Sequence, residues 1–442
     1  MERAQQEKAA NSPWRESANP FGEYRRQLDR QRMKLAARDA EPIIADLVAV
    51  DGSLSHLEDA LCRHLGSTLA RQDAAIDARR ESGVTEILDA YSPDQLLDAI
   101  TDATVLAAHK SALTADELEH RNGTWRLLLG LARVVPHPSA EIAIKAVTDL
   151  RANVDSLPHG SIEAVPVGTA LWCRDAYGTR FAITAPFAGA DGPDRWYLWD
   201  IDVCGTDAFT VGAGYFPDAE QGFAAWRAAV GPDAAEGRRL EPVCDPYLAG
   251  RLLPGLPDFF HPGGESEAQY AEFHRCRRLA QELRRSDFLD GSGSAEAAPQ
   301  EPEFDKDAWI ADFAAWRAEH RPGQNAVPEG FPADEDDDEP LTEQALYQEL
   351  ADSWSCSEFP EFAYSCSPHR IAQLAARIRD FYADDFARII LRLVPDLAAW
   401  LTERAGLSAS LDGRTRAYAD GVAIPDVDLG HRAESLLAQI QE

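Results

Sequence analysis

The stretch TRFAITAPFAGADGPDRWYLWDIDVC, residues 179–204, decides the fold that this sequence predicts. Every second residue is apolar in 179–187 and again in 195–204, which is the period of a strand with one face on a core. The Gly- and Asp-rich segment between these two runs is typical of a connecting loop. The sequence therefore predicts two antiparallel strands.

Neighbouring residues extend this pair of strands. We expect one strand at 167–174, before a turn at Asp175–Gly178, and another at 209–215. Phe216-Pro217-Asp218 then begins an apolar-periodic helix that Gly231-Pro232 ends. These signals predict an α+β module: an antiparallel β-meander of about four strands with one helix packed on one face.

The regions on both sides of this module carry helical periodicity. Before it, Ser92–Gln95 and Thr114–Glu117 are capping boxes that begin helices, and Asn122-Gly123 predicts a break before the next helix. After it, 266–288 has helical spacing, and Ser367-Pro368 begins another helix. The predicted fold class is mainly α with a central α+β module and an acidic disordered linker.

The distribution of charged residues along the chain indicates further domain boundaries. Its formal net charge is -32, from 75 acidic and 43 basic side chains. Residues 286–339 hold sixteen acidic and three basic side chains, which is typical of a disordered linker, and a short helix is expected inside it at 309–320. The predicted domains are a polar and basic arm at 1–40, a helical domain at 41–158, the α+β module with a trailing helix at 159–285, the acidic linker at 286–340 and a helical domain at 341–442.

The composition limits which classes of partner and which cellular compartment we expect. A strongly negative surface repels phosphate backbones and anionic lipid, so we expect nucleic acid to bind only through residues 1–40, and no membrane contact. Met1–Ser17 lacks the apolar core of a signal peptide, and no apolar run is long enough to span a membrane. Seven scattered cysteines predict reduced thiols, and a total of five lysines suits a high-GC bacterial source. We expect a cytoplasmic protein.

Common catalytic signatures are missing from the sequence. It contains no GxxxxGK phosphate-binding loop, no HExxH zinc motif and no complete GxGxxG dinucleotide fingerprint. The only Gly–Ser-rich stretch, 291–294, lies in the acidic linker, where a nucleophile would have no rigid frame. No cofactor is expected from motifs alone.

Asp200 and Asp202 are the first candidates for a chemical site. They stand two residues apart on a predicted strand, so both carboxylates point to one face, where they could hold Mg2+ or Mn2+ and serve as catalytic acids together with Glu220. The alternative is an exposed sheet face on which one of them pairs with Arg174 or Arg180 of a neighbouring strand.

Cys356, Cys366 and His369 are the second candidate set. Their spacing comes closest to that of metal ligands, and thiolate with imidazole suits zinc. A structural zinc site needs four ligands, and no fourth stands nearby in the sequence. The alternative is that both cysteines are buried apolar residues.

Aromatic and acidic residues suggest contact with a partner. The module is denser in aromatic rings than one small core needs, and the hexapeptide FAAWRA of its helix, 223–228, recurs at 313–318 in the linker helix. The candidate interaction residues are Trp196, Trp199, Trp226, Trp309, Phe313, Trp316, Asp334, Asp336 and Asp338.

Three functional hypotheses follow from these patterns. The first is a non-enzymatic interaction protein, an adaptor or regulator whose protein partner has a basic surface. The second is a metal-dependent hydrolase or transferase with Asp200 and Asp202 as its acids. The third is a nucleic-acid-linked regulator that uses the basic arm, or that mimics DNA through its acidity.

Overall fold

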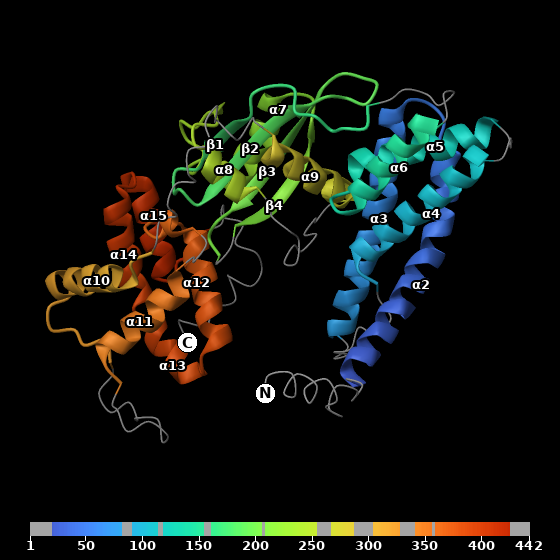
Figure 1. Ribbon diagram of the computed structural model, residues 1–442. Coiled ribbons are helices and arrows are strands. Elements are labelled where there is room, and N and C mark those ends of the chain that lie inside the picture. Colours follow the sequence, from blue (N-terminus) through green and yellow to red (C-terminus); the bar gives the residue numbers. More distant parts are fainter. Residues whose placement is uncertain are drawn as a thin grey trace, which may run out of the picture. The chain divides into compact units, whose positions relative to one another are not determined.

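The computed structural model describes residues 20–81, 91–113, 118–153, 161–205, 208–253, 267–286, 304–327, 341–355 and 359–424. The chain divides into two compact units, 1–163 and 164–442, shown in Figure 1. Among the described helices, none combines the length and the apolar character that a membrane crossing requires.

The first unit is helical, as predicted. Its described helices are α2 (Pro20–Val48), α3 (Leu54–Glu81), α4 (Pro93–Leu113), α5 (Leu118–Val134) and α6 (Ser139–Asn153). Helix α2 packs on α4 and α5, and α5 also packs on α3 and α6. Residues 20–40, which the sequence assigned to an arm, are thus the first part of a helix within this unit. Residues 1–19 of the predicted arm lie outside the described residues.

Of two local sequence patterns in this unit, one predicted the structure correctly and the other did not. The capping box at Ser92 is confirmed, because the Ser92 amide donates to Gln95 Oε1 at 2.9 Å and the Gln95 amide donates to Ser92 Oγ at 3.2 Å. The break predicted at Asn122-Gly123 is wrong, because α5 runs through it. A side chain at Gly123 would place its Cβ 2.4 Å from the Val48 carbonyl oxygen, so this glycine allows a close approach to the end of α2.

The second unit begins with the predicted meander, to which the structure adds a short fifth strand. The strands are β1 (Leu171–Arg174), β2 (Arg180–Phe187), β3 (Arg195–Asp202), β4 (Phe209–Phe216) and β5 (Glu241–Pro242). Their order in the sheet is β4-β3-β2-β1-β5, and all the pairings are antiparallel. Three helices accompany them: α7 (Ala219–Val230), α8 (Pro246–Leu252) and α9 (Glu267–Arg285).

Helices cover both faces of this sheet, whereas the sequence predicted one covered face. Tyr197, Trp199 and Ile201 share a core with residues of α8 and α9. On the opposite face, Leu198 packs with Phe223 and Trp226 of α7. The face that carries Asp200 and Asp202 is therefore buried and not exposed, with 7% and 3% of these residues accessible. Figure 1 shows α7 and α9 on the two sides of the strands.

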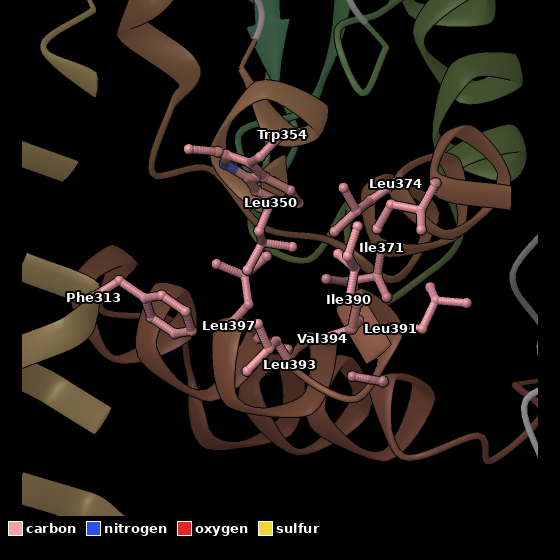
Figure 2. Packing of buried hydrophobic residues seen from close by; sticks show 14 of the residues in the cluster. Phe313, Leu350, Trp354, Ile371, Leu374, Ile390, Leu391, Leu393, Val394 and Leu397 are labelled. Atoms are coloured by element: carbon pink, nitrogen blue, oxygen red, sulfur yellow. The ribbon is translucent and has the colours of Figure 1, made fainter. Parts of the chain in front are cut away.

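The rest of the second unit is a helical domain with one large apolar core. Its described helices are α10 (Lys306–His320), α11 (Glu343–Trp354), α12 (Pro368–Phe381), α13 (Asp384–Leu391), α14 (Val394–Ala405) and α15 (Ala409–Ala419). Figure 2 shows Phe313, Leu350, Ile371 and Leu397, from four of these helices, within this core. Helix α10 belongs to the core, so the short helix expected inside an acidic linker is an integral part of the domain.

Candidate functional site

Strand β3 ends with two aspartates that have different partners. Arg180 of β2 donates from Nε to Asp200 Oδ1 and from Nη2 to Asp200 Oδ2, both at 2.7 Å. This bidentate pair uses both carboxylate oxygens of Asp200. Asp200 therefore has the cross-strand partner that the sequence offered as the alternative to a metal site.

Asp202 faces the first turn of α12. His369 Nδ1 lies 2.7 Å from Asp202 Oδ2, while Asp202 Oδ1 accepts the backbone N–H of Cys204 at 2.6 Å. Burial would raise the pKa of Asp202, but His369, Arg180 and the Cys204 amide together outweigh burial and lower the pKa to about 2. Burial opposes the charged form of His369 as well, yet Asp202 and Cys204 together raise the pKa of His369 well above its usual value.

Cys204 joins the same cluster. The Val203 amide donates to Thr179 O at 3.0 Å, which continues the strand past Asp202 and places Cys204 on the Asp202 side. One ligand-type atom from each of Asp202, Cys204 and His369 lies within 4.8 Å of the other two. Burial and the nearby Asp202 carboxylate raise the pKa of the Cys204 thiol, so without a metal it is neutral.

The start of α12 positions the histidine. Ser367 is the N-cap, since its Oγ accepts the Arg370 amide at 3.1 Å, and Pro368 takes the first helical position, as the sequence predicted. The same Ser367 Oγ lies 3.6 Å from Cys204 Sγ. One turn further, the side-chain nitrogen of Gln373 lies 3.3 Å from His369 Nε2. Both ring nitrogens of His369 therefore have polar neighbours.

A small cavity lined by both polar and apolar residues opens beside this cluster. It encloses about 60 Å³, and Asp202, His369 and Ser367 line it together with Asp175, Thr179 and the end of α7. Asp175 accepts the amides of Thr179 at 2.7 Å and Arg180 at 3.1 Å, which fixes the β1–β2 turn. Because Asp175 is buried, its pKa rises to about 6.

The candidate interaction residues lie mostly in cores. Trp199, Trp226, Trp309 and Phe313 are at most 1% exposed, so these four rings pack inside the protein. Trp316 is half-buried; its Nε1 donates to Glu403 Oε2 at 2.7 Å.

Trp196 is half-buried. Asp334, Asp336 and Asp338 lie outside the described residues.

The structure brings together residues from the two predicted candidate sets and leaves other members of these sets apart. Glu220 is exposed in the first turn of α7 and does not line the cavity. Cys366 is buried in the helical core and is not part of the three-residue cluster, and Cys356 lies outside the described residues. His369 instead meets Asp202 from the other predicted set.

Cys204 was missed by the sequence analysis. The signal was present, because Cys204 follows Asp202 by two residues in a strand and thus shares its face. None of the six cysteines within the described residues forms a disulfide.

Comparisons of this chain with known protein families, with curated proteins and with solved structures found no match. Its function therefore has to be inferred from its own residues.

Proposed function

We propose that this protein is an adaptor or regulator that binds a protein partner with a basic surface. The proposal rests on the segment 328–340, PEGFPADEDDDEP. The residues just before and just after this segment pack against one apolar core, that of the helical domain. The segment contains seven carboxylates and no basic side chain. Dense negative charge attracts a positively charged surface and raises the rate of encounter with it.

Both flanking residues are part of the helical domain. Val327, just before the segment, and Leu341, just after it, pack against the same apolar core. The Ala326 amide donates to Glu343 Oε1 at 2.5 Å, and Thr342 caps α11 by accepting the Ala345 amide at 3.1 Å. A folded domain therefore holds both ends of the acidic segment.

The sequence on both sides of this segment contains few basic residues. No lysine or arginine occurs between Arg321 and Arg370. Among the described residues, Asp396 pairs with Arg317 and Asp352 pairs with Lys306. The density of acids in 334–339, and the lack of basic residues near them in the sequence, support a role for this run in attracting a partner.

A charge-matched pair of variants tests the proposal. In one variant, the six acids of 334–339 are replaced by their amides. The control replaces six exposed acids of the first unit by their amides, so that both variants have the same net charge: Glu41, Asp46, Asp51, Asp94, Asp102 and Asp149.

Tagged wild type, variant and control would be incubated with lysate of the native host, once untreated and once treated with nuclease, and each captured protein would then be purified and titrated at several salt concentrations. We expect a basic partner whose binding weakens with salt, persists in the control and falls at least about tenfold in the 334–339 variant. Equal affinity of the variant and the control would reject the proposal. Capture that disappears with nuclease would favour the nucleic-acid hypothesis instead.

A metal-dependent hydrolase is the second candidate, favoured by the cavity at which Asp202 and His369 meet. A water molecule activated there would attack a carbonyl or phosphoryl centre. Hydrolysis of p-nitrophenyl acetate and p-nitrophenyl phosphate with added Zn2+ would be compared between wild type and His369→Gln. Equal rates for the two proteins would remove this candidate.

A further inference from the structure

We infer that Asp202, Cys204 and His369 form a binding site for Zn2+. The inference goes beyond the proposed adaptor role and does not depend on it. Carboxylate, thiolate and imidazole together make a mixed oxygen, sulfur and nitrogen ligand set. Mg2+ and Ca2+ prefer oxygen ligands alone, whereas thiolate and imidazole favour zinc. The chemistry of the three side chains therefore points to a transition-metal-type ion.

The three ligand atoms are close enough to meet at one ion. Bonds of about 2.0–2.3 Å arranged tetrahedrally place the ligand atoms about 3.3–3.6 Å from one another. In the structure the Asp202–His369 contact is 2.7 Å, and all three atoms lie within 4.8 Å. Small side-chain rotations would bring these distances to the required values without moving the strand or the helix.

Neighbouring groups leave one ligating atom on each of Asp202 and His369. Asp202 Oδ1 already accepts the Cys204 amide, which leaves Oδ2 for the ion. His369 Nδ1 faces Asp202, while Nε2 lies 3.3 Å from the Gln373 amide group. With that amide turned so that its oxygen faces the ring, it accepts Nε2–H and fixes Nδ1 as the ligand.

Two features beside Cys204 would stabilise a thiolate ligand once a metal ion binds. Ser367 Oγ accepts the Arg370 amide, so its hydrogen is free to point to Cys204 Sγ, 3.6 Å away. The N-terminus of α12 adds a partial positive charge on the same side. When Zn2+ binds, the Cys204 thiol and the His369 imidazolium each release one proton to solvent.

The cavity beside the cluster would supply the remaining coordination position. Asp202 and His369 line it, and its volume of about 60 Å³ has room for water. Three protein ligands and one open position are the arrangement of catalytic zinc sites, in which the ion lowers the pKa of the bound water. This site would supply the metal that the second candidate function requires.

Metal binding by the full-length protein tests the inference. After treatment with a chelator, wild type should take up one Zn2+ per chain and release protons, and Co2+ should give the near-ultraviolet absorption of a cobalt–thiolate bond. In Cys204→Ser that absorption should vanish, and Zn2+ affinity should fall by at least about a hundredfold, because lost outer partners alone cost about 10–100-fold. Cys366→Ser, another buried thiol, is the matched control and should behave as wild type.

A second variant guards against a folding defect. His369 is partly exposed, so His369→Gln should keep the fold, checked by circular dichroism, and still lose Zn2+ affinity. Zn2+ binding that is equal in all variants, or that is absent from wild type, would overturn the inference. So would a cobalt–thiolate band that Cys366→Ser loses and Cys204→Ser keeps.

The two proposals fail separately. The 334–339 variant should bind Zn2+ like wild type while losing its partner, and loss of Zn2+ binding in that variant would contradict the assignment to Asp202, Cys204 and His369.

Discussion

Two buried aspartates of the second unit, Asp396 and Asp202, have opposite kinds of partner. On α14, Asp396 accepts Arg317 Nε at 2.9 Å and Arg321 Nε at 2.8 Å, so a guanidinium holds each of its oxygens. At the end of β3, Asp202 meets His369, with the Cys204 thiol and a cavity beside them. Arginine cannot release its proton in a protein, whereas imidazole and thiol both can.

Asp396 therefore has a structural role only, whereas the protons on the partners of Asp202 can be replaced by a metal ion. Around Asp396, Arg317 Nη1 also donates to the Tyr347 hydroxyl at 2.7 Å, so the network is closed and no proton can be replaced by a metal. Around Asp202, loss of a proton from His369 and another from Cys204 leaves three ligands facing one point. Burial of a carboxylate is common to both sites; the identity of its partner decides which of them can do chemistry.

Removing the carboxylate of Asp396 should cause the largest loss of stability. Asp396→Asn removes the carboxylate nearest to the buried guanidinium of Arg317 and leaves it only Glu343, 3.7 Å away. Breaking a buried pair in this way costs up to about 3–5 kcal/mol. Urea unfolding of the full chain measures this loss. The control is Asp312→Asn, whose half-exposed pair with Arg404 is worth at most about 1 kcal/mol.

The matching variant is Asp202→Asn, measured by the same urea unfolding in the absence of added metal. His369 can become neutral once its partner is gone, so we expect a smaller loss of stability than in Asp396→Asn. Equal losses in the two variants would break the distinction between the sites.

A third buried carboxylate, Asp175, is held by backbone amides and not by a cationic side chain. Burial raises its pKa from 3.8 to about 6; Arg174 opposes the rise and Asp202 adds to it. The unfolded chain therefore loses this proton near pH 4 and the folded chain near pH 6, so stability falls as pH rises through that window. The decline amounts to about 3 kcal/mol.

Asp175→Asn keeps an acceptor for the Thr179 and Arg180 amides and has no carboxyl proton to lose. We expect the difference in unfolding free energy between variant and wild type to change in favour of the variant from pH 4 to pH 7, measured in urea at each pH. A difference that is independent of pH would contradict the assignment.

The sequence predicted the sheet well because alternation reports one buried face directly. It predicted side-chain environments less well, as the repeated hexapeptide FAAWRA shows. In α7 its arginine, Arg227, is exposed, while the corresponding Arg317 of α10 is buried against Asp396. Six identical residues therefore lie in different surroundings, because distant helices decide which side of each copy is covered.

The candidate site shows the same limit. Asp202 and His369 were each named from sequence, but in separate sets, because only the folded chain brings the end of β3 to the start of α12. The sequence contains the D-x-C spacing of Asp202 and Cys204, yet nothing local indicates that a histidine more than a hundred residues later faces them. Glu220 and Cys366, chosen by the same local reasoning, lie outside the cluster.

Ser367→Ala should have the smallest effect on stability and a selective effect on metal binding. Loss of the N-cap hydroxyl costs about 1 kcal/mol, and loss of the hydrogen bond to the Cys204 thiolate should weaken Zn2+ binding by about 10–100-fold. The control is Ser92→Ala, which removes the N-cap hydroxyl of α4 in the first unit and should cost similar stability with unchanged Zn2+ affinity. Unfolding in urea and competition with a metal indicator measure the two effects. Equal Zn2+ affinity in both variants would show that Ser367 does not support a thiolate ligand, and the distinction between an exchangeable site at Asp202 and a closed one at Asp396 would then rest on His369 alone.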